Sequence, residues 1–246
     1  MKIAMDKLVA GGIAAVIAAL TLTAVLSVDG PVHAAQAQAP VTVPAPSGSA
    51  DVRQPGITRA QVVFAGGCFW GVQGVFQHIN GVDNAVSGYI GGSAADASYP
   101  RVGSGRTGHA EAVQVTYDPS KVSYGQLMQV FFSVVHDPTL LNRQGPDRGT
   151  QYRSAVYVDD PKQRDATRAY IDQLQRAKAY AAPVVTQVDG GKRFYPAEGY
   201  HQNYLTLHPE SQYIQINDAP KVAALKQQYP ALYREKPRLV STLSAR

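Results

Sequence analysis

The chain has 246 residues, of which 45% are hydrophobic and 17% are charged, so it is long enough to bury one sizeable core. Its formal net charge of +5 arises without a long run of basic residues. This pattern gives little support for nucleic-acid binding and is typical of a domain with a mildly positive surface.

Residues 1–34 have the pattern of an export signal. Lys2 and Lys7 give a positive start, residues 8–28 carry no charge, and Val32–Ala34 (VHA) resembles a small-residue cleavage site. The uncharged run is also about as long as the ~20 residues that cross a bilayer. We therefore expect a cleaved signal peptide and a periplasmic or exported protein, with an anchor in the inner membrane through residues 8–28 as the alternative.

Residues 35–56 are rich in Ala, Pro, Gln and Ser and contain no aromatic residue, so we expect a flexible linker. We expect one folded domain at residues 57–218 and a C-terminal extension with a short helix at residues 219–246. Because Cys68 is the only cysteine, an internal disulfide is excluded, and the thiol is either paired between chains or free.

The hydrophobic patterns alternate between strand and helix along the folded domain. In chain order they predict a strand at 61–65, a helix from about 68 to 81, a loop at 88–109, a strand at 109–118, a helix from the capping box Ser123/Gln126, a polar loop at 136–151, a strand at 152–158, a helix from Asp160 towards Tyr180, a strand at 183–188 and a helix at 222–229. The spacing is too irregular for a Rossmann or barrel protein. We therefore expect a single α+β domain with a mixed or antiparallel central sheet flanked by helices.

The segment GGCFWG (66–71) contains the only cysteine and the only tryptophan. It lies between the first strand and the first helix, where backbone amides favour negative charge and can lower the pKa of a thiol. Cys68 is therefore a candidate nucleophile, although a free cysteine is also often simply packed in a core. Phe69 and Trp70 either belong to the core or line an apolar pocket beside the sulfur.

Glu111 stands at the start of a strand in which Val113, Val115 and Tyr117 form the apolar side. If the alternation is regular, Glu111 points to that same side, where a carboxylate is costly unless it is paired or protonated. A carboxyl group that is protonated at neutral pH can act as a general acid. The alternative is that Glu111 lies in water at the end of the strand or pairs with Arg106.

Several other polar residues stand in loops or at the ends of elements, where each one alone is ordinarily structural or solvated. These residues are Tyr99, Asp147, Tyr152 and His201. A cysteine–histidine dyad is conceivable, with His109, His136, His201 or His208 as the base. The histidine spacing and the single cysteine give little support for a metal site.

Beginning at GCFWG, the sequence resembles the peptide-methionine (S)-S-oxide reductases, the A-type methionine sulfoxide reductases. The resemblance continues through VSGYIGG (86–92), YPRVGSGRTGHAEAVQVTYDP (99–119), FFSVVHDPTLLNRQGPDRGTQYRSAVY (131–157) and AEGYHQNYL (197–205). These motifs occur in order over residues 61–218, nearly the whole folded domain, which would then be catalytic. The resemblance implies a two-layer α/β plait with a ferredoxin-like core.

The resemblance also implies a repair enzyme for oxidised proteins, in which a thiol attacks the sulfur of methionine sulfoxide and becomes a sulfenic acid. The resemblance implies that Cys68 is the nucleophile and Glu111 the acid. Tyr99 and Tyr152 are then the hydrogen-bond donors to the sulfoxide oxygen, and Asp147 is a further catalytic residue. The implied substrate-binding residues are Phe69 and Trp70, which surround the methyl group, and His201. No metal or bound cofactor is implied. The implied substrates are oxidised proteins or peptides and free methionine sulfoxide, and we expect a monomer that does not bind nucleic acid.

The chain departs from the family pattern at two points. Many relatives carry further cysteines near the C-terminus that resolve the sulfenic acid, and this chain has none. The reductant must therefore be an external thiol, from a thioredoxin-like or glutaredoxin-like protein or from a small thiol such as glutathione. In addition, Gly199 stands where relatives often have an acidic residue, which puts a helper role at that position in doubt.

Two other classes of function remain at this stage. One is a cysteine hydrolase or acyltransferase that uses Cys68 with a histidine base, which would leave Tyr99, Glu111 and Tyr152 without a role. The other is a secreted binding protein that dimerises through a disulfide at Cys68.

Overall fold

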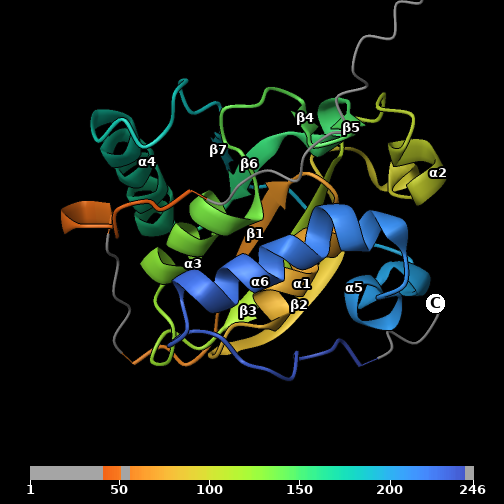
Figure 1. Ribbon diagram of the computed structural model, residues 1–246. Helices are drawn as coiled ribbons and strands as arrows, with labels where there is room; N and C mark the ends of the chain where they lie inside the picture. The colour runs from red at the N-terminus through yellow and green to blue at the C-terminus, as the bar shows by residue number, and fades with distance from the viewer. Residues whose placement is uncertain (1–40, 51–55, 242–246) are drawn as a thin grey trace, which may run out of the picture. The chain divides into compact units, whose positions relative to one another are not determined.

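The computed structural model describes residues 41–50 and 56–241 (Figure 1). The expected signal peptide or anchor at residues 1–34 lies outside the described residues. Within the described ranges, no helix has the length and apolar character needed to cross a membrane.

The elements follow one another along the chain in a mixed order. The strands are β1 (Ala60–Gly66), β2 (Val82–Ile90), β3 (Ala110–Tyr117), β4 (Arg143–Gln144), β5 (Asp147–Arg148), β6 (Ser154–Tyr157), β7 (Gln187–Asp189) and β8 (Phe194–Pro196). The α-helices are α1 (Phe69–Gln77), α2 (Tyr99–Val102), α3 (Tyr124–Val130), α4 (Pro161–Arg176), α5 (Tyr204–Leu207) and α6 (Ala219–Gln228). Short 3-10 or π turns are η1 (Gly48–Ala50), η2 (Ala94–Asp96), η3 (Phe131–Val135), η4 (Thr150–Tyr152), η5 (Gly199–His201) and η6 (Ile214–Asp218).

The central sheet has the strand order β7-β6-β1-β3-β2-β8. Its neighbouring strands are antiparallel except β6 and β7, which are parallel. Helices α1, α3 and α6 lie in front of this sheet in Figure 1. The expected α+β domain with a mixed sheet flanked by helices is confirmed.

The sequence patterns missed β2 and β8 and misplaced β7. Residues 85–90 of β2 are buried on both faces of the sheet, so their sequence does not alternate between polar and apolar residues. The loop expected at residues 88–109 therefore begins inside a strand. The strand expected at residues 183–188 is also wrong in extent, because only Gln187–Asp189 pairs with β6.

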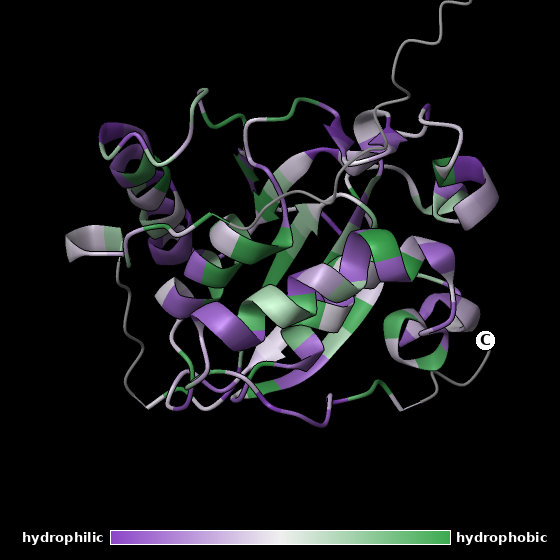
Figure 2. Cartoon of the chain, viewed as in Figure 1, coloured by the Kyte–Doolittle hydropathy of each residue, from purple (hydrophilic) through white to green (hydrophobic). Residues whose placement is uncertain are grey.

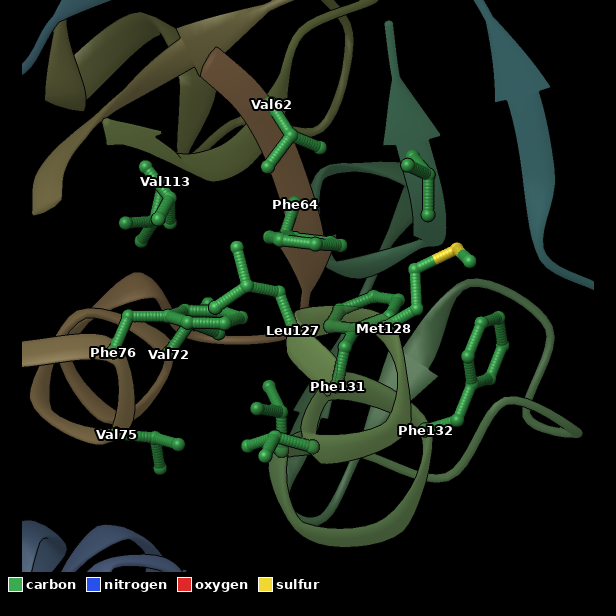
Figure 3. Close-up of a cluster of buried hydrophobic side chains, with 14 of the residues drawn as sticks. Val62, Phe64, Val72, Val75, Phe76, Val113, Leu127, Met128, Phe131 and Phe132 are labelled. Carbon is green, nitrogen blue, oxygen red and sulfur yellow. The ribbon is translucent and has the colours of Figure 1, made fainter. Parts of the chain in front are cut away.

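The main core lies between the sheet and the helices. Phe64 of β1 stacks on Phe76 of α1, with ring centroids 4.8 Å apart, and its ring lies 4.7 Å from that of Phe131 (Figure 3). By contrast, α4 is hydrophilic over much of its surface (Figure 2) and buries a single stripe that includes Tyr170 and Leu174. The core thus fixes β1 and α1 against each other.

The connection from β1 to α1 requires two glycines. Gly67 has a φ of +93°, and a Cβ atom there would lie 2.6 Å from the side chain of Gln144. A Cβ atom at Gly66 would lie 3.0 Å from the ring of Phe131. The tight turn makes Cys68 the N-cap of α1, as the sequence predicts.

Residues 41–50 pack on the domain, so the expectation of a flexible linker is wrong for this part of 35–56. Val43 and Ala50 are buried, and the hydroxyl of Tyr170 donates to the carbonyl of Pro44 at 2.7 Å. The backbone of Val41 also donates to the carbonyl of Ser133 at 3.1 Å. The sequence pattern concealed this packing because single small apolar residues, rather than a periodic stripe, make the contacts.

The C-terminal segment is also part of the folded domain, which corrects the boundary at residue 218. Helix α6 packs against α1, and its Ala224 and Leu225 are buried in the main core (Figure 1). Beyond α6, Tyr233 forms a β-bridge with Ile79.

The packing of residues 41–50 predicts a stability effect in Val43→Ala. Removing two buried methyl groups should lower the free energy of unfolding by about 1–2 kcal/mol. Thr42→Ala is the matched control, because Thr42 is exposed and its truncation should change stability by less than about 0.5 kcal/mol. Urea denaturation measures both; equal stability of the two variants would mean that the segment does not pack on the domain.

Candidate active site

Cys68 is the structural centre of the candidate site. It is 9% exposed, and its position at the start of α1 is the one that the sequence predicts. Burial raises the pKa of the Cys68 thiol well above its ordinary value, and the carboxyl groups of Glu111 and Asp218 raise this pKa further. The backbone amide of Trp70 lowers the pKa but does not outweigh burial, so the pKa of Cys68 is raised and not lowered as the helix start alone suggests.

Glu111 points inward from β3, on the same face as Val113, Val115 and Tyr117. It is 2% exposed, which excludes the solvated carboxylate considered as an alternative. The backbone N–H of Phe69 donates to Glu111 Oε2 at 3.1 Å. Burial nevertheless raises the pKa of Glu111 to about 8, so this carboxyl group is mainly protonated at neutral pH.

Tyr99 at the start of α2, Asp147 of β5 and Tyr152 of η4 all interact electrostatically with this pair. Burial raises the pKa of Tyr152, and the nearby acidic groups of Glu111, Asp147 and Cys68 raise it further. The pKa of Tyr99 is raised by burial and then by Glu111 and Cys68. Both hydroxyls therefore remain protonated hydrogen-bond donors close to the thiol and the carboxyl group.

The side chain of Asp147 is held in place by Tyr213. The hydroxyl of Tyr213 donates to Asp147 Oδ2 at 2.5 Å. Burial raises the pKa of Asp147, while this hydrogen bond acts in the opposite direction. Cys68 thus has several carboxyl groups as neighbours, which explains why its thiolate is disfavoured in the resting site.

Aromatic rings surround the other side of the helix start. Trp70 stacks on Tyr204 with ring centroids 3.8 Å apart, and its indole N–H donates to His201 Nδ1 at 3.1 Å. His201 also lies 4.3 Å from the ring of Tyr99 and 5.1 Å from that of Phe69. Phe69 is fully buried and belongs to the core, whereas Trp70 is partly exposed, and its role in a ligand pocket stays a prediction.

Buried amides fix the segment that carries His201 and Tyr204. The side chain of Gln202 accepts from Gln73 Nε2 at 2.7 Å and from the backbone of Ser87 at 3.0 Å. It also donates to the carbonyls of Ser87 and Ala197. This network ties the segment to both α1 and β2 and so sets the position of the His201 ring.

Two comparisons of sequence identify the family. A family model described as Peptide methionine sulfoxide reductase matches residues 60–232. The Mesorhizobium japonicum protein named Peptide methionine sulfoxide reductase MsrA 2 is 64% identical over 182 residues, which are 74% of this chain and 93% of that relative. This chain belongs to the peptide methionine sulfoxide reductase family.

Solved structures of the family share the fold. The reduced form of Mxr1 from Saccharomyces cerevisiae has a TM-score of 0.59 and 30% identity, and the match covers 68% of this chain and 94% of that chain. Methionine sulfoxide reductase A of Corynebacterium diphtheriae has a TM-score of 0.54 and 30% identity, and the match covers 71% and 86% of the two chains.

The structure does not support the two readings outside this family. Of the four histidines considered as bases, three direct their hydrogen bonds elsewhere: His109 to Gly92 and Ser93, His136 to Phe131 and Ser154, and His201 to Trp70. The fourth, His208, lies 3.6 Å from Glu210. Burial of Cys68 also disfavours a disulfide between chains through this residue.

Sequence reasoning missed several residues of this reductase-family site. Glu198 accepts from the backbone N–H of Tyr99 at 2.9 Å and from the hydroxyl of Tyr89 at 2.7 Å, so it positions Tyr99. The position of Glu198 in the AEGYHQNYL motif is the signal that could have identified it from the sequence. Tyr213 and Asp218 had no such signal, because they stand in a tail without a periodic pattern.

A narrow cavity of about 40 Å³ also adjoins Cys68. Its lining includes Gln144, Asp147, Tyr213 and Lys221. Of the predicted site residues, only Cys68 and Asp147 line it. Phe69, Trp70, Tyr99, Glu111, Tyr152 and His201 do not line this cavity.

The raised pKa of Glu111 predicts a pH-dependent cost to stability. The folded protein holds this proton up to about pH 8, whereas an ordinary glutamate loses it near 4.5, so the folded state binds more protons between these values. Stability should therefore fall as pH rises from about 4.5 to 8, by up to about 1.4 kcal/mol per pH unit from this group. Glu111→Gln should remove that part of the slope in urea titrations at several pH values. If the free energy of unfolding fell equally steeply with pH in the wild type and the variant, Glu111 would not be held protonated in the folded state.

Proposed function

We propose that this protein reduces (S)-methionine sulfoxide, in oxidised proteins or free, to methionine, with Cys68 as the nucleophile. One observation carries the proposal: a buried carboxyl group, Glu111, whose pKa burial raises to about 8, interacts with the only thiol of the chain. A sulfoxide oxygen bears negative charge, and its sulfur becomes electrophilic when that oxygen is protonated or strongly hydrogen-bonded.

The oxygen of the substrate would lie between Glu111, Tyr99 and Tyr152. Both tyrosine hydroxyls donate hydrogen bonds, and these bonds strengthen as the oxygen takes up charge in the transition state. The methyl group of the substrate would contact Trp70 beside the buried ring of Phe69. Because one side of the site accepts a methyl group and the other accepts an oxygen, only one arrangement around the sulfur fits.

The proton balance follows from the two raised pKa values. Glu111 gives its proton to the sulfoxide oxygen, and the thiol of Cys68 loses its own proton to the carboxylate as its sulfur attacks. As Cys68 Sγ forms a bond to the substrate sulfur, the sulfur–oxygen bond breaks and the oxygen leaves as water, with both protons passed on by Glu111. Water then attacks Cys68 Sγ and returns a proton to Glu111, the bond between the two sulfurs breaks, and methionine leaves with Cys68 as a sulfenic acid. The substrate is reduced by two electrons and the thiol is oxidised by two, with no net change in protons.

An external thiol then resets the enzyme. A first thiol displaces the sulfenic oxygen as water and forms a mixed disulfide, and a second thiol releases Cys68. We propose a thioredoxin-like or glutaredoxin-like protein or a small thiol as the donor. We further propose that the protein is a monomer that acts in the periplasm after cleavage of residues 1–34, with anchoring by residues 8–28 as the alternative.

We also propose that the core is a two-layer plait of the ferredoxin-like type. The order β1-α1-β2-β3-α3-β6 along the chain, with the four strands arranged as β6-β1-β3-β2 in the sheet, supports this assignment.

The decisive assay uses the two separated epimers of a methionine sulfoxide peptide with excess dithiothreitol. The wild type should reduce the S epimer alone, and Cys68→Ser should be inactive because an alcohol cannot take the oxygen as a sulfenic acid. Product is measured by chromatography. Reduction of the R epimer alone, or activity in Cys68→Ser, would refute the proposal.

The role of Glu111 predicts a change in both rate and pH profile. Glu111→Gln should slow single-turnover reduction by about 10²–10⁴-fold, the usual contribution of a general acid. In the wild type this rate should fall as pH rises through about 8, where Glu111 loses its proton, and the fall should be absent in the variant. A rate unchanged by the substitution would remove Glu111 from the mechanism.

A further inference from the structure

The cavity beside Cys68 has a polar wall that the sulfoxide reaction does not use. Lys221 lines it and donates from Nζ to Asp218 Oδ1 at 3.0 Å. Burial lowers the pKa of His136, which also lines the cavity, to about 4, so this histidine is neutral. Lys221 is therefore the positive group of the lining that the structure describes.

Lys221 is held by Asp218, the N-cap of α6, whose carboxyl group packs against the first turn of α1. Asp218 is fully buried, and its Oδ2 atom has no hydrogen-bond partner. A Cβ atom at Gly71 would lie 2.1 Å from Asp218 Oδ1, so only glycine leaves room for this carboxylate in the first turn of the helix. The ammonium group of Lys221 keeps two further N–H donors beyond the bond to Asp218.

We propose that this cavity receives the primary thiol of the external reductant and that Lys221 stabilises its thiolate. The inference rests on the proposed function, because it concerns the sulfenic acid that sulfoxide reduction leaves on Cys68. A thiolate attacks sulfur opposite the group that leaves. The leaving oxygen lies with Glu111, Tyr99 and Tyr152, and none of these three residues lines the cavity.

The chemistry of the step balances. The thiolate sulfur forms a bond to Cys68 Sγ, the bond from Sγ to oxygen breaks, and Glu111 protonates the departing hydroxide to give water. The entering thiol is oxidised as the sulfenic sulfur is reduced, and a second thiol then releases Cys68 as a thiol and forms a disulfide of the reductant. A cavity of about 40 Å³ has room for a slender primary thiol group.

Charge supports a role for the lysine at this step. The carboxyl groups of Asp218 and Asp147 act on Cys68, and they oppose the approach of a negatively charged sulfur. An approaching thiolate therefore needs a compensating cation, and Lys221 stands in the cavity wall. Because one N–H of Lys221 already donates to Asp218, the ammonium group is oriented before the thiol arrives.

The test isolates the second half of the catalytic cycle. Cys68 is converted to the sulfenic acid, either by one turnover of sulfoxide peptide without reductant or, independently, by hydrogen peroxide. The oxidised protein is then mixed with β-mercaptoethanol or with a thioredoxin-type dithiol protein. The sulfenic acid that remains is measured by a sulfenate-specific label and mass spectrometry. Lys221→Met, which keeps the length of the side chain, is compared with the wild type and with Lys226→Met.

Lys226 is the matched control, since it lies on the same helix and pairs with Glu235 at 2.9 Å on the surface. Lys221→Met should slow reduction of the sulfenic acid by about 10-fold or more, the effect of losing one hydrogen bond to a charged group. Lys221→Arg should restore most of the rate, and the single-turnover rate of sulfoxide reduction should change far less. If Lys221→Met slows reduction of the sulfenic acid by one of the reductants, the thiol of that reductant enters through the cavity.

An unchanged rate with both reductants would overturn the inference, as would equal slowing of the sulfoxide step. Should Lys221→Met fail to fold because it leaves Asp218 unpaired, the double variant Asp218→Asn/Lys221→Met removes the buried charge with its partner and is measured in the same way. The arm that uses hydrogen peroxide separates the two proposals. If no sulfoxide is reduced, the proposed function fails, while the effect of Lys221 on the sulfenic acid is still measured.

Discussion

The buried carboxyl group of Glu111 is the constraint around which the site is organised. It stands on the core face of β3, where an ionised carboxylate would be costly, and the backbone N–H of Phe69 holds it at 3.1 Å. Burial keeps its proton in place and also raises the pKa of the neighbouring thiol. Burial thus disfavours negative charge on both the carboxyl group and the thiol of the resting site.

This arrangement depends on a rigid connection between β1 and α1. The glycine pair permits a turn that no residue with a Cβ atom could make at Gly67, and the stacked rings of Phe64 and Phe76 fix the strand and the helix against each other. Cys68 therefore has one position relative to Glu111. In the proposed reaction, a nucleophile and an acid held on such a rigid frame need little reorganisation.

The two ends of the described chain close around the same site. Val41, near the N-terminal end of the described residues, lines the cavity beside Cys68. Tyr213 and Lys221, which come late in the chain, line the same cavity. Since the chain has no second thiol, these segments do not resolve the sulfenic acid themselves. Their polar groups instead shape the surroundings in which an outside thiol reacts.

Much of the site could be predicted from the sequence because its signals are local. The position of Cys68 at a helix start follows from a strand, two glycines and a helical stripe in succession, and the inward direction of Glu111 follows from the two-residue period of a strand. The motifs of the family then supplied Tyr99, Tyr152 and Asp147, which no periodicity marks.

The tertiary structure decided what depends on contacts between distant residues. The raised pKa of Cys68 follows from burial beside carboxyl groups on β3 and in the C-terminal segment, whereas the helix start alone suggested a lowered pKa. Strand β2 was hidden because it is buried on both faces, and the packing of residues 41–50 rests on isolated small residues. The sequence by itself therefore predicted the candidate reacting groups and the elements on which Cys68 and Glu111 stand. Only the fold determined their protonation and the pairing of Asp218 with Lys221, because both depend on which segments exclude water from one another.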